Sequence, residues 1–124
     1  MTSYRPWPAI AVLVGLTMAT GAVAPADARV AVEDEIRCLA LNVYFESRSE
    51  PDVGKLAVAH VVMNLVADRR FAGSVCGVIR QGGDKVRHKC QFSWWCDGQT
   101  DRPLEARAWE RSRAIARAVY LGVT

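Results

Sequence analysis

The sequence predicts one small domain that is mainly helical, with a single small β element. Three observations lead to this prediction. The chain has 124 residues, enough for one domain and not for two. Apolar residues recur at helical spacing through much of residues 33–121. The aromatic stretch at residues 90–96 lacks that spacing and runs into an Asp-Gly turn, which is typical of an extended segment or hairpin.

The composition excludes several classes of protein. Apolar residues make up 51% and charged residues 23% of the chain, so extensive disorder is not expected. Sixteen Lys and Arg against thirteen Asp and Glu leave a formal charge of +3, which is too small and too scattered for a dedicated nucleic-acid binder. One long apolar stretch is present, which excludes a protein with several membrane spans. We therefore expect no nucleic-acid partner.

The long apolar stretch covers residues 9–24 (AIAVLVGLTMATGAVA) and has the features of a targeting segment. A short positively charged flank precedes it, and an A-x-A site ending at Ala28 follows it. The run is shorter than the ~20 residues of a spanning helix. An uncleaved membrane anchor is the alternative. We predict a signal peptide at residues 1–28 and a mature domain at residues 29–124, exported to the periplasm, the extracellular space or the cell wall, with no membrane span after cleavage.

The cysteine pattern predicts disulfides. An even number of cysteines in an exported domain favours two bridges, and the sequence leaves all three pairings open. The four candidates are Cys38, Cys76, Cys90 and Cys96. A zinc site formed by the last two with His60 and His88 is the alternative, but a C-x5-C spacing does not match a zinc knuckle. We therefore expect no metal and no cofactor.

Helical periodicity predicts four helices. The first covers residues 33–47, with apolar side chains along one face. Pro51 ends it and starts a second helix at residues 51–67, which is apolar almost all round and is therefore expected to lie buried at the centre. A short third helix is predicted at residues 73–80. The last helix is predicted at residues 104–121.

Two glutamates near the end of the first helix are candidates for acid–base chemistry. Glu46 and Glu50 are four residues apart, so an unbroken helix would place both carboxylates on one face and point Arg48 elsewhere. A carboxyl group buried near a second one has a raised pKa, which a general acid needs at neutral pH. The alternative is that both are solvated or cap the next helix. Spacing alone favours that alternative.

Longer stretches of the chain resemble a known family. The relevant segments are CLALNVYFESRSEP at residues 38–51, GKLAVA at 54–59, VVMN at 61–64, FAGSVCGVI at 71–79 and QFSWWCDG at 91–98. In this order and spacing, they are similar to the SleB-type cell-wall hydrolase family, whose best-known members are spore cortex-lytic enzymes. The resemblance covers nearly all of the predicted mature domain.

The resemblance implies a lysozyme-like fold, mainly helical with the helices around a small β hairpin, and cleavage of the glycan strands of peptidoglycan. Family members are described as lytic transglycosylases, in which the first glutamate of an E-x-R-x-E motif is the catalytic acid/base; here it is Glu46. On this basis Glu50 is assigned to helix capping or positioning. Residues expected to bind or support the substrate are Gln91, Phe92, Ser93 and Trp94.

Three features depart from the family pattern. Ser49 stands where the family usually has glycine, and Leu65 stands where it usually has arginine. The family domain continues into a Thr-Gly-Ala…Tyr segment that helps to form the groove, whereas this sequence stops at Thr124. We therefore expect a domain truncated at its C-terminus. The alternative function is a non-catalytic wall-binding or regulatory module with an incomplete groove.

Export gives the first testable prediction. The apolar run and the A-x-A site imply that the secreted or periplasmic protein begins at Arg29. The intact mass of the exported protein measures this directly. A full-length species retained in the membrane would show that the segment is an uncleaved anchor.

Overall fold

The computed structural model describes residues 2–3, 5–6, 8, 21–82 and 88–124. Its elements are α1 (Ala26–Ser47), α2 (Asp52–Ala67), α3 (Val75–Ile79), the short 3-10 helix η1 (Ser93–Cys96) and α4 (Ala106–Tyr120). Within these ranges the regular structure is helical throughout, which confirms the mainly helical class. Most of the apolar run at residues 9–24, predicted to belong to a signal peptide, lies outside the described residues.

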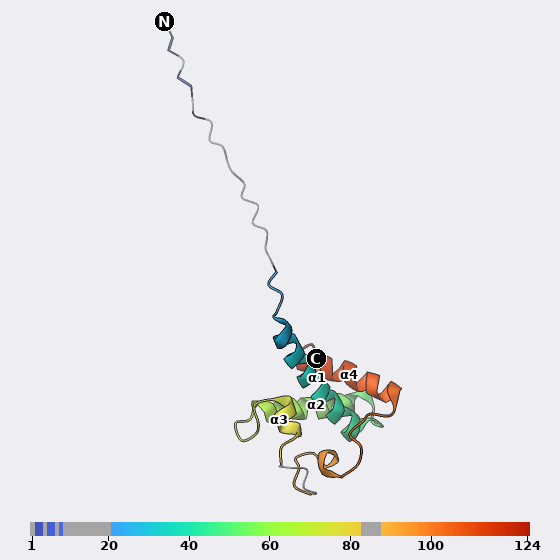
Figure 1. The fold of residues 1–124 in the computed structure, drawn as a ribbon. Helices are drawn as coiled ribbons and strands as arrows, with labels where there is room; N and C mark the ends of the chain where they lie inside the picture. The colour runs from blue at the N-terminus through green and yellow to red at the C-terminus, as the bar shows by residue number, and fades with distance from the viewer. Residues whose placement is uncertain (1, 4, 7, 9–20, 83–87) are drawn as a thin grey trace.

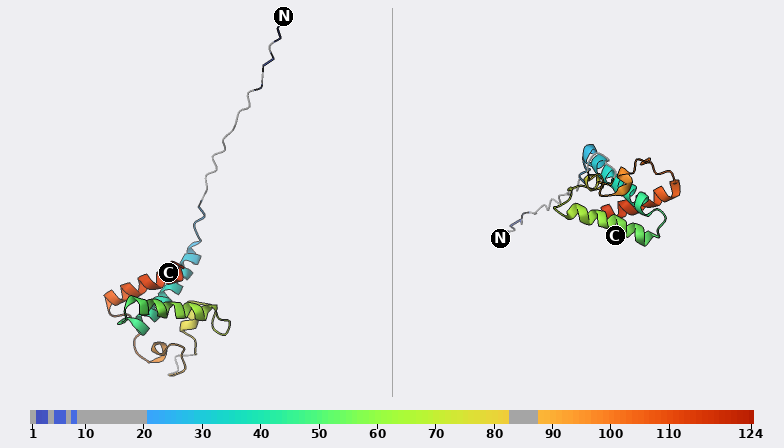
Figure 2. Two further views of the ribbon diagram at one scale, coloured as in Figure 1. Left: turned by 180° about the vertical axis from the view of Figure 1, so that it is seen from behind. Right: turned by 90° about the horizontal axis from the view of Figure 1, so that it is seen from below.

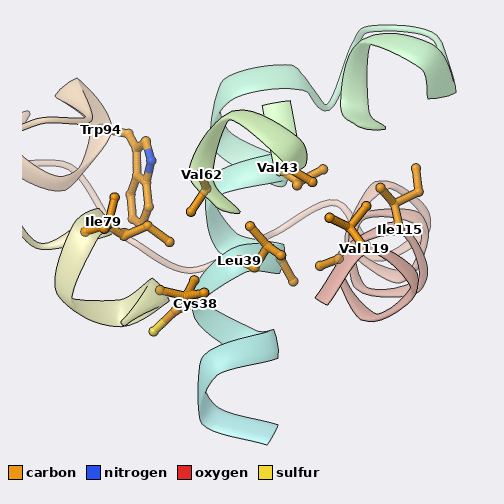
Figure 3. Packing of buried hydrophobic residues seen from close by; sticks show 13 residues of the cluster. Cys38, Leu39, Val43, Val62, Ile79, Trp94, Ile115 and Val119 are labelled. Carbon is orange, nitrogen blue, oxygen red and sulfur yellow. The ribbon is translucent and has the colours of Figure 1, made fainter. Parts of the chain in front are cut away.

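Helix α1 lies at the centre of the domain and packs against each of the other three α-helices (Figures 1 and 2). Its fully buried residues Leu39 and Val43 occupy the middle of the core. Figure 3 shows what surrounds them: Ile79 and Trp94 on one side, Ile115 and Val119 of α4 on the other, and Val62 of α2. One helix thus supplies the surface on which the remaining elements bury their apolar faces.

Helices α1 and α4 run antiparallel, with an ion pair near each end. Arg117, near the end of α4, donates to Glu33 near the start of α1 at 2.8 Å. Arg48, directly after α1, donates to Glu105, directly before α4, at 2.9 Å. Both pairs are largely exposed, so each adds at most about 1 kcal/mol to stability. Their main effect is to align the two helix ends.

Helix α2 has the predicted bounds but lies at the surface, so the prediction of a centrally buried helix is wrong. Ala59 and Val62 face α1 and are completely buried, whereas Val53 is 74% and Val61 is 52% exposed. A helix that is apolar all round does not reveal in its sequence which face will find a partner. Here one face packs in the core and the opposite face stays exposed.

Helix α3 is fixed to α1 by a carboxylate and a disulfide. The Glu35 side chain of α1 accepts hydrogen bonds from the backbone N–H groups of Val75 (2.5 Å) and Cys76 (3.2 Å). These groups have no partner within a helix, and a negative charge is favourable at that end. The Cys38–Cys76 disulfide links the same two helices, with its Cα atoms 5.2 Å apart. A five-residue helix depends on such external contacts because it is too short to be stable alone.

The predicted β hairpin at residues 90–96 is wrong, because the segment forms a tight loop ending in η1. The backbone N–H of Trp95 donates to the carbonyl of Phe92 at 3.2 Å, a local bond in place of a cross-strand one. The Cys90–Cys96 disulfide closes the loop, with Cα atoms 6.0 Å apart. A four-residue helix is too short to leave a periodic pattern, so its sequence resembles an extended segment.

The ends of two helices also differ from the prediction. Helix α1 begins at Ala26, well before residue 33, so the expected cleavage after Ala28 falls in its first turn. Helix α4 begins at Ala106 instead of Leu104. None of the helices that the structure describes is both long enough and apolar enough to cross a membrane.

The two disulfides give a stability prediction. The Cys38–Cys76 bridge joins residues 38 apart and the Cys90–Cys96 bridge residues 6 apart. Closing the longer loop removes more entropy from the unfolded chain, so it should stabilise by about 4 kcal/mol against about 2 kcal/mol for the shorter one. Replacing each pair with alanine and measuring denaturant unfolding tests this. An equal or larger loss for the Cys90–Cys96 pair would contradict the loop-entropy account.

Candidate active site

A pocket of about 420 Å³ lies between the last turn of α1, η1 and the loop that leads to α4. Its aromatic lining comes from Tyr44, Phe45 and Trp94. Its charged lining residues are Glu46, Arg48, Asp97, Arg102 and Glu105. The pocket therefore combines segments from the first helix and from the last third of the chain.

Glu46 projects from the last turn of α1 into this pocket. Its neighbour Ser47 is buried and donates a hydrogen bond to the carbonyl of Val43 at 2.7 Å, which fixes the end of the helix. The Glu46 side chain reaches solvent, but the surrounding atoms remove part of its hydration, and this partial burial raises its pKa above the ordinary value. A carboxyl group that holds its proton closer to neutral pH is suited to general acid catalysis.

Trp94 forms the wall of the pocket beside Glu46. Its ring stacks on Phe45, with centroids 4.8 Å apart and planes 20° apart. Its indole N–H donates to the side-chain oxygen of Asn42 at 2.8 Å, and both side chains are buried. Trp94 is only 7% exposed, so it belongs to the core and to the pocket wall at once.

Arg48 lines the same pocket, although an unbroken helix would point it elsewhere. Its guanidinium lies 5.3 Å from the ring centroid of Tyr44 and donates to the carboxylate of Glu105. The backbone N–H of Glu105 in turn donates to the hydroxyl oxygen of Tyr44 at 3.1 Å. Because α1 ends at Ser47, the pocket extends around the helix end and reaches both Glu46 and Arg48.

The other predicted site residues are only partly brought together. Ser93 lines the pocket with Trp94, Gln91 is exposed away from it, and Phe92 is half-buried against the core. Glu50 lies beyond the end of α1 and outside the pocket lining. Its backbone carbonyl accepts a hydrogen bond from the buried ammonium group of Lys55, which connects the turn to α2.

Sequence reasoning missed three charged residues of the pocket. Asp97 was assigned only to a turn, and its side chain accepts from the backbone N–H of Gln99 at 2.8 Å. Arg102 lies in a loop without periodicity or a recognisable motif, and Glu105, predicted to lie inside the last helix, directly precedes α4. Only the folded chain brings them close to Glu46. In the described part of the chain, no three His, Cys, Asp or Glu side chains are grouped so that they could hold a metal ion.

A family comparison covers most of the chain. Residues 49–124 match the family described as Cell Wall Hydrolase. The chain belongs to this family. The matched range includes the pocket wall from Ser93 to Glu105 and begins shortly after Glu46, so Glu46 itself lies outside it.

Curated relatives of this chain include two named spore cortex-lytic enzymes. The protein from Bacillus cereus is 45% identical over 47 residues, which are 38% of this chain and 18% of the relative. The protein from Bacillus subtilis is 46% identical over 46 residues, which are 37% of this chain and 15% of the relative. The alignments thus span less than a fifth of each relative. No solved structure matches the chain.

The raised pKa of Glu46 predicts a measurable effect on the stability of the domain. The folded state holds the Glu46 proton more tightly than the unfolded chain does, so the carboxyl group favours folding at low pH and loses that contribution as the pH rises through its folded pKa. Glu46→Gln should therefore raise Tm at neutral pH and leave it unchanged near about pH 3, where both side chains are neutral.

Glu50→Gln is the matched control, because Glu50 is exposed and lies outside the pocket. It should give no comparable rise at neutral pH. Thermal unfolding of the three proteins followed by circular dichroism across the pH range measures the effect. A lower Tm for Glu46→Gln at neutral pH would show that its carboxylate stabilises the fold.

Proposed function

We propose that this cell wall hydrolase cleaves the glycan strand of peptidoglycan, with Glu46 as the catalytic acid/base. The observation that carries the proposal is a single carboxyl group with a raised pKa, placed in a pocket with aromatic and charged walls. Membership of the Cell Wall Hydrolase family supports the polymer as substrate. The names of the curated relatives, spore cortex-lytic enzymes, agree with a wall substrate.

One carboxyl group is sufficient for a lytic transglycosylase. In the first step Glu46 donates its proton to the glycosidic oxygen as the bond to muramic acid breaks. The resulting carboxylate then takes the proton of the muramic acid C6 hydroxyl, whose oxygen attacks the anomeric carbon and closes a 1,6-anhydro ring. The substrate's own hydroxyl replaces water, so the proton returns to Glu46 and no second catalytic carboxylate is required.

The neighbouring carboxylates favour this mechanism over one with two carboxylates. Glu105 is paired with Arg48, and Asp97 accepts a hydrogen bond from the backbone of its own turn. A retaining hydrolase uses a second carboxylate as nucleophile, and an inverting one uses it as the base that activates water. Glu105 and Asp97 are each held toward a local partner, whereas burial raises the pKa of Glu46, which makes Glu46 the best candidate for proton transfer.

We further infer that the domain works outside the cytoplasm, since peptidoglycan lies there and the sequence carries a predicted signal peptide. Two disulfides agree with an oxidising compartment. We keep the proposal that Glu50 is a positioning residue at the junction of α1 and α2, where its side chain lies beside Gly54.

Glycan release from purified sacculi tests the proposal. The wild-type protein should release fragments ending in 1,6-anhydromuramic acid, which mass spectrometry distinguishes because they are one water lighter than hydrolytic products. Glu46→Gln keeps the shape of the side chain but has no transferable proton, so it should lower the rate by roughly 10²–10⁴-fold or more. Glu50→Gln should lower it far less.

Two other outcomes of the glycan-release assay would contradict parts of the proposal. Reducing-end products of normal mass would establish a glycosidase and contradict the transglycosylase mechanism. A folded wild-type protein that binds sacculi and releases nothing would favour the non-catalytic wall-binding module. Circular dichroism of each variant shows whether a loss of activity reflects a loss of fold.

A further inference from the structure

We propose that Asn42 is a positioning residue for Glu46, acting through the indole of Trp94 that forms the adjacent wall of the pocket. The inference rests on the proposed function of Glu46 as acid/base. Asn42 lies one helical turn before Glu46 on α1, has no exposed surface and is absent from the pocket lining. It therefore acts on the site only through its neighbours.

The bond between Asn42 and Trp94 joins two buried side chains that are 52 residues apart in the sequence. Stacking on Phe45 fixes the distance and tilt of the indole but allows the ring to slide in its plane. A hydrogen bond of 2.8 Å from the indole N–H to the Asn42 oxygen removes that freedom, because hydrogen bonds are directional. The two contacts together define the position of the wall.

The buried amide group of Asn42 lowers the stability of the core. The Asn42 nitrogen has no hydrogen-bond partner among the described residues, and leaving a buried polar group unpaired lowers stability. A leucine of similar size would avoid that cost, since it has no polar atoms. The presence of asparagine at this position is explained if orientation of Trp94 matters more than stability.

Trp94 and Glu46 line the same pocket, so a shift of the indole is expected to change how much water reaches the Glu46 carboxyl group. Partial burial is the cause of the raised Glu46 pKa, and Trp94 is the largest side chain lining the same pocket. The other charged groups that line it are Arg48, Asp97, Arg102 and Glu105. Substitution of Asn42 leaves all four of these charged side chains unchanged. A change in the Glu46 pKa would therefore reflect a change in the position of Trp94.

The test is a carbon-13 NMR titration of the Glu46 carboxyl group in the folded protein. Asn42→Leu removes the acceptor, and Trp94→Phe removes the donor while keeping an aromatic ring. Each should let water in and lower the Glu46 pKa toward its ordinary value. Because both act through one bond, the double variant should resemble either single variant, with no additional fall.

Two variants separate positioning from a general loss of packing. Asn42→Asp keeps an acceptor oxygen for Trp94, so the Glu46 pKa should stay at or above its wild-type value. Val62→Ala opens a cavity in the core on α2, away from the pocket, and should lower stability with no change in the Glu46 pKa. Unfolding curves of all variants provide the comparison.

Glycan release gives the second readout. In Asn42→Leu and Trp94→Phe, kcat should fall roughly 10–100-fold with a smaller change in KM, and activity should decline at a lower pH as Glu46 loses its proton earlier. An unchanged Glu46 pKa in Trp94→Phe and Asn42→Leu would overturn the inference and make the bond purely structural. If Asn42→Leu does not fold, Trp94→Phe alone decides.

The two proposals fail separately. The titration does not depend on turnover, so an inactive wild-type protein would contradict the proposed function, while the Glu46 pKa in the variants would still test the role of Asn42. Conversely, an active protein whose Asn42 variants keep both the Glu46 pKa and the pH profile would contradict only the positioning role.

Discussion

The burial of residues 38–45 of α1 on all sides is the constraint on which the rest of the structure depends. A chain this small has room for one helix at its centre, and every other element must find its apolar contacts there. Leu39 and Val43 fill the core, Cys38 and Glu35 hold α3, and Asn42 holds the loop that carries η1. Glu46 lies in the last turn of the same helix, so the candidate acid extends from the central element of the domain.

Much of the fold and part of the site could be predicted from the sequence. Periodicity identified four helices, and Pro51 placed the start of α2 correctly, because these signals are local. The position of α2 could not be predicted, because an apolar helix shows no preferred face. The hairpin prediction failed because η1 is too short to show a periodic pattern. Its backbone hydrogen bond, from Trp95 to Phe92, lies inside the loop that the Cys90–Cys96 disulfide closes.

The site shows the same division between local and non-local information. Glu46 could be named as a candidate from the sequence because it begins an E-x-R-x-E motif. Arg102 and Glu105 were not, since they belong to a loop whose shape depends on the Arg48 ion pair and the Tyr44 hydroxyl. Trp94 was expected to bind or support the substrate, and in the structure it belongs both to the core and to the pocket lining. A pocket wall built from a core side chain is stiff because it shares the packing of the interior.

The sequence distance between Asn42 and Trp94 has a consequence for the nascent chain. The first half of the polypeptide can form α1 through local contacts, but the pocket exists only after a loop of about fifty residues has closed. Until then Glu46 is surrounded by water and has the acidity of any solvated glutamate. The chemistry proposed for this residue is therefore a property of the completed fold. In an unfinished or unfolded chain the Glu46 side chain lacks the pocket that this chemistry requires.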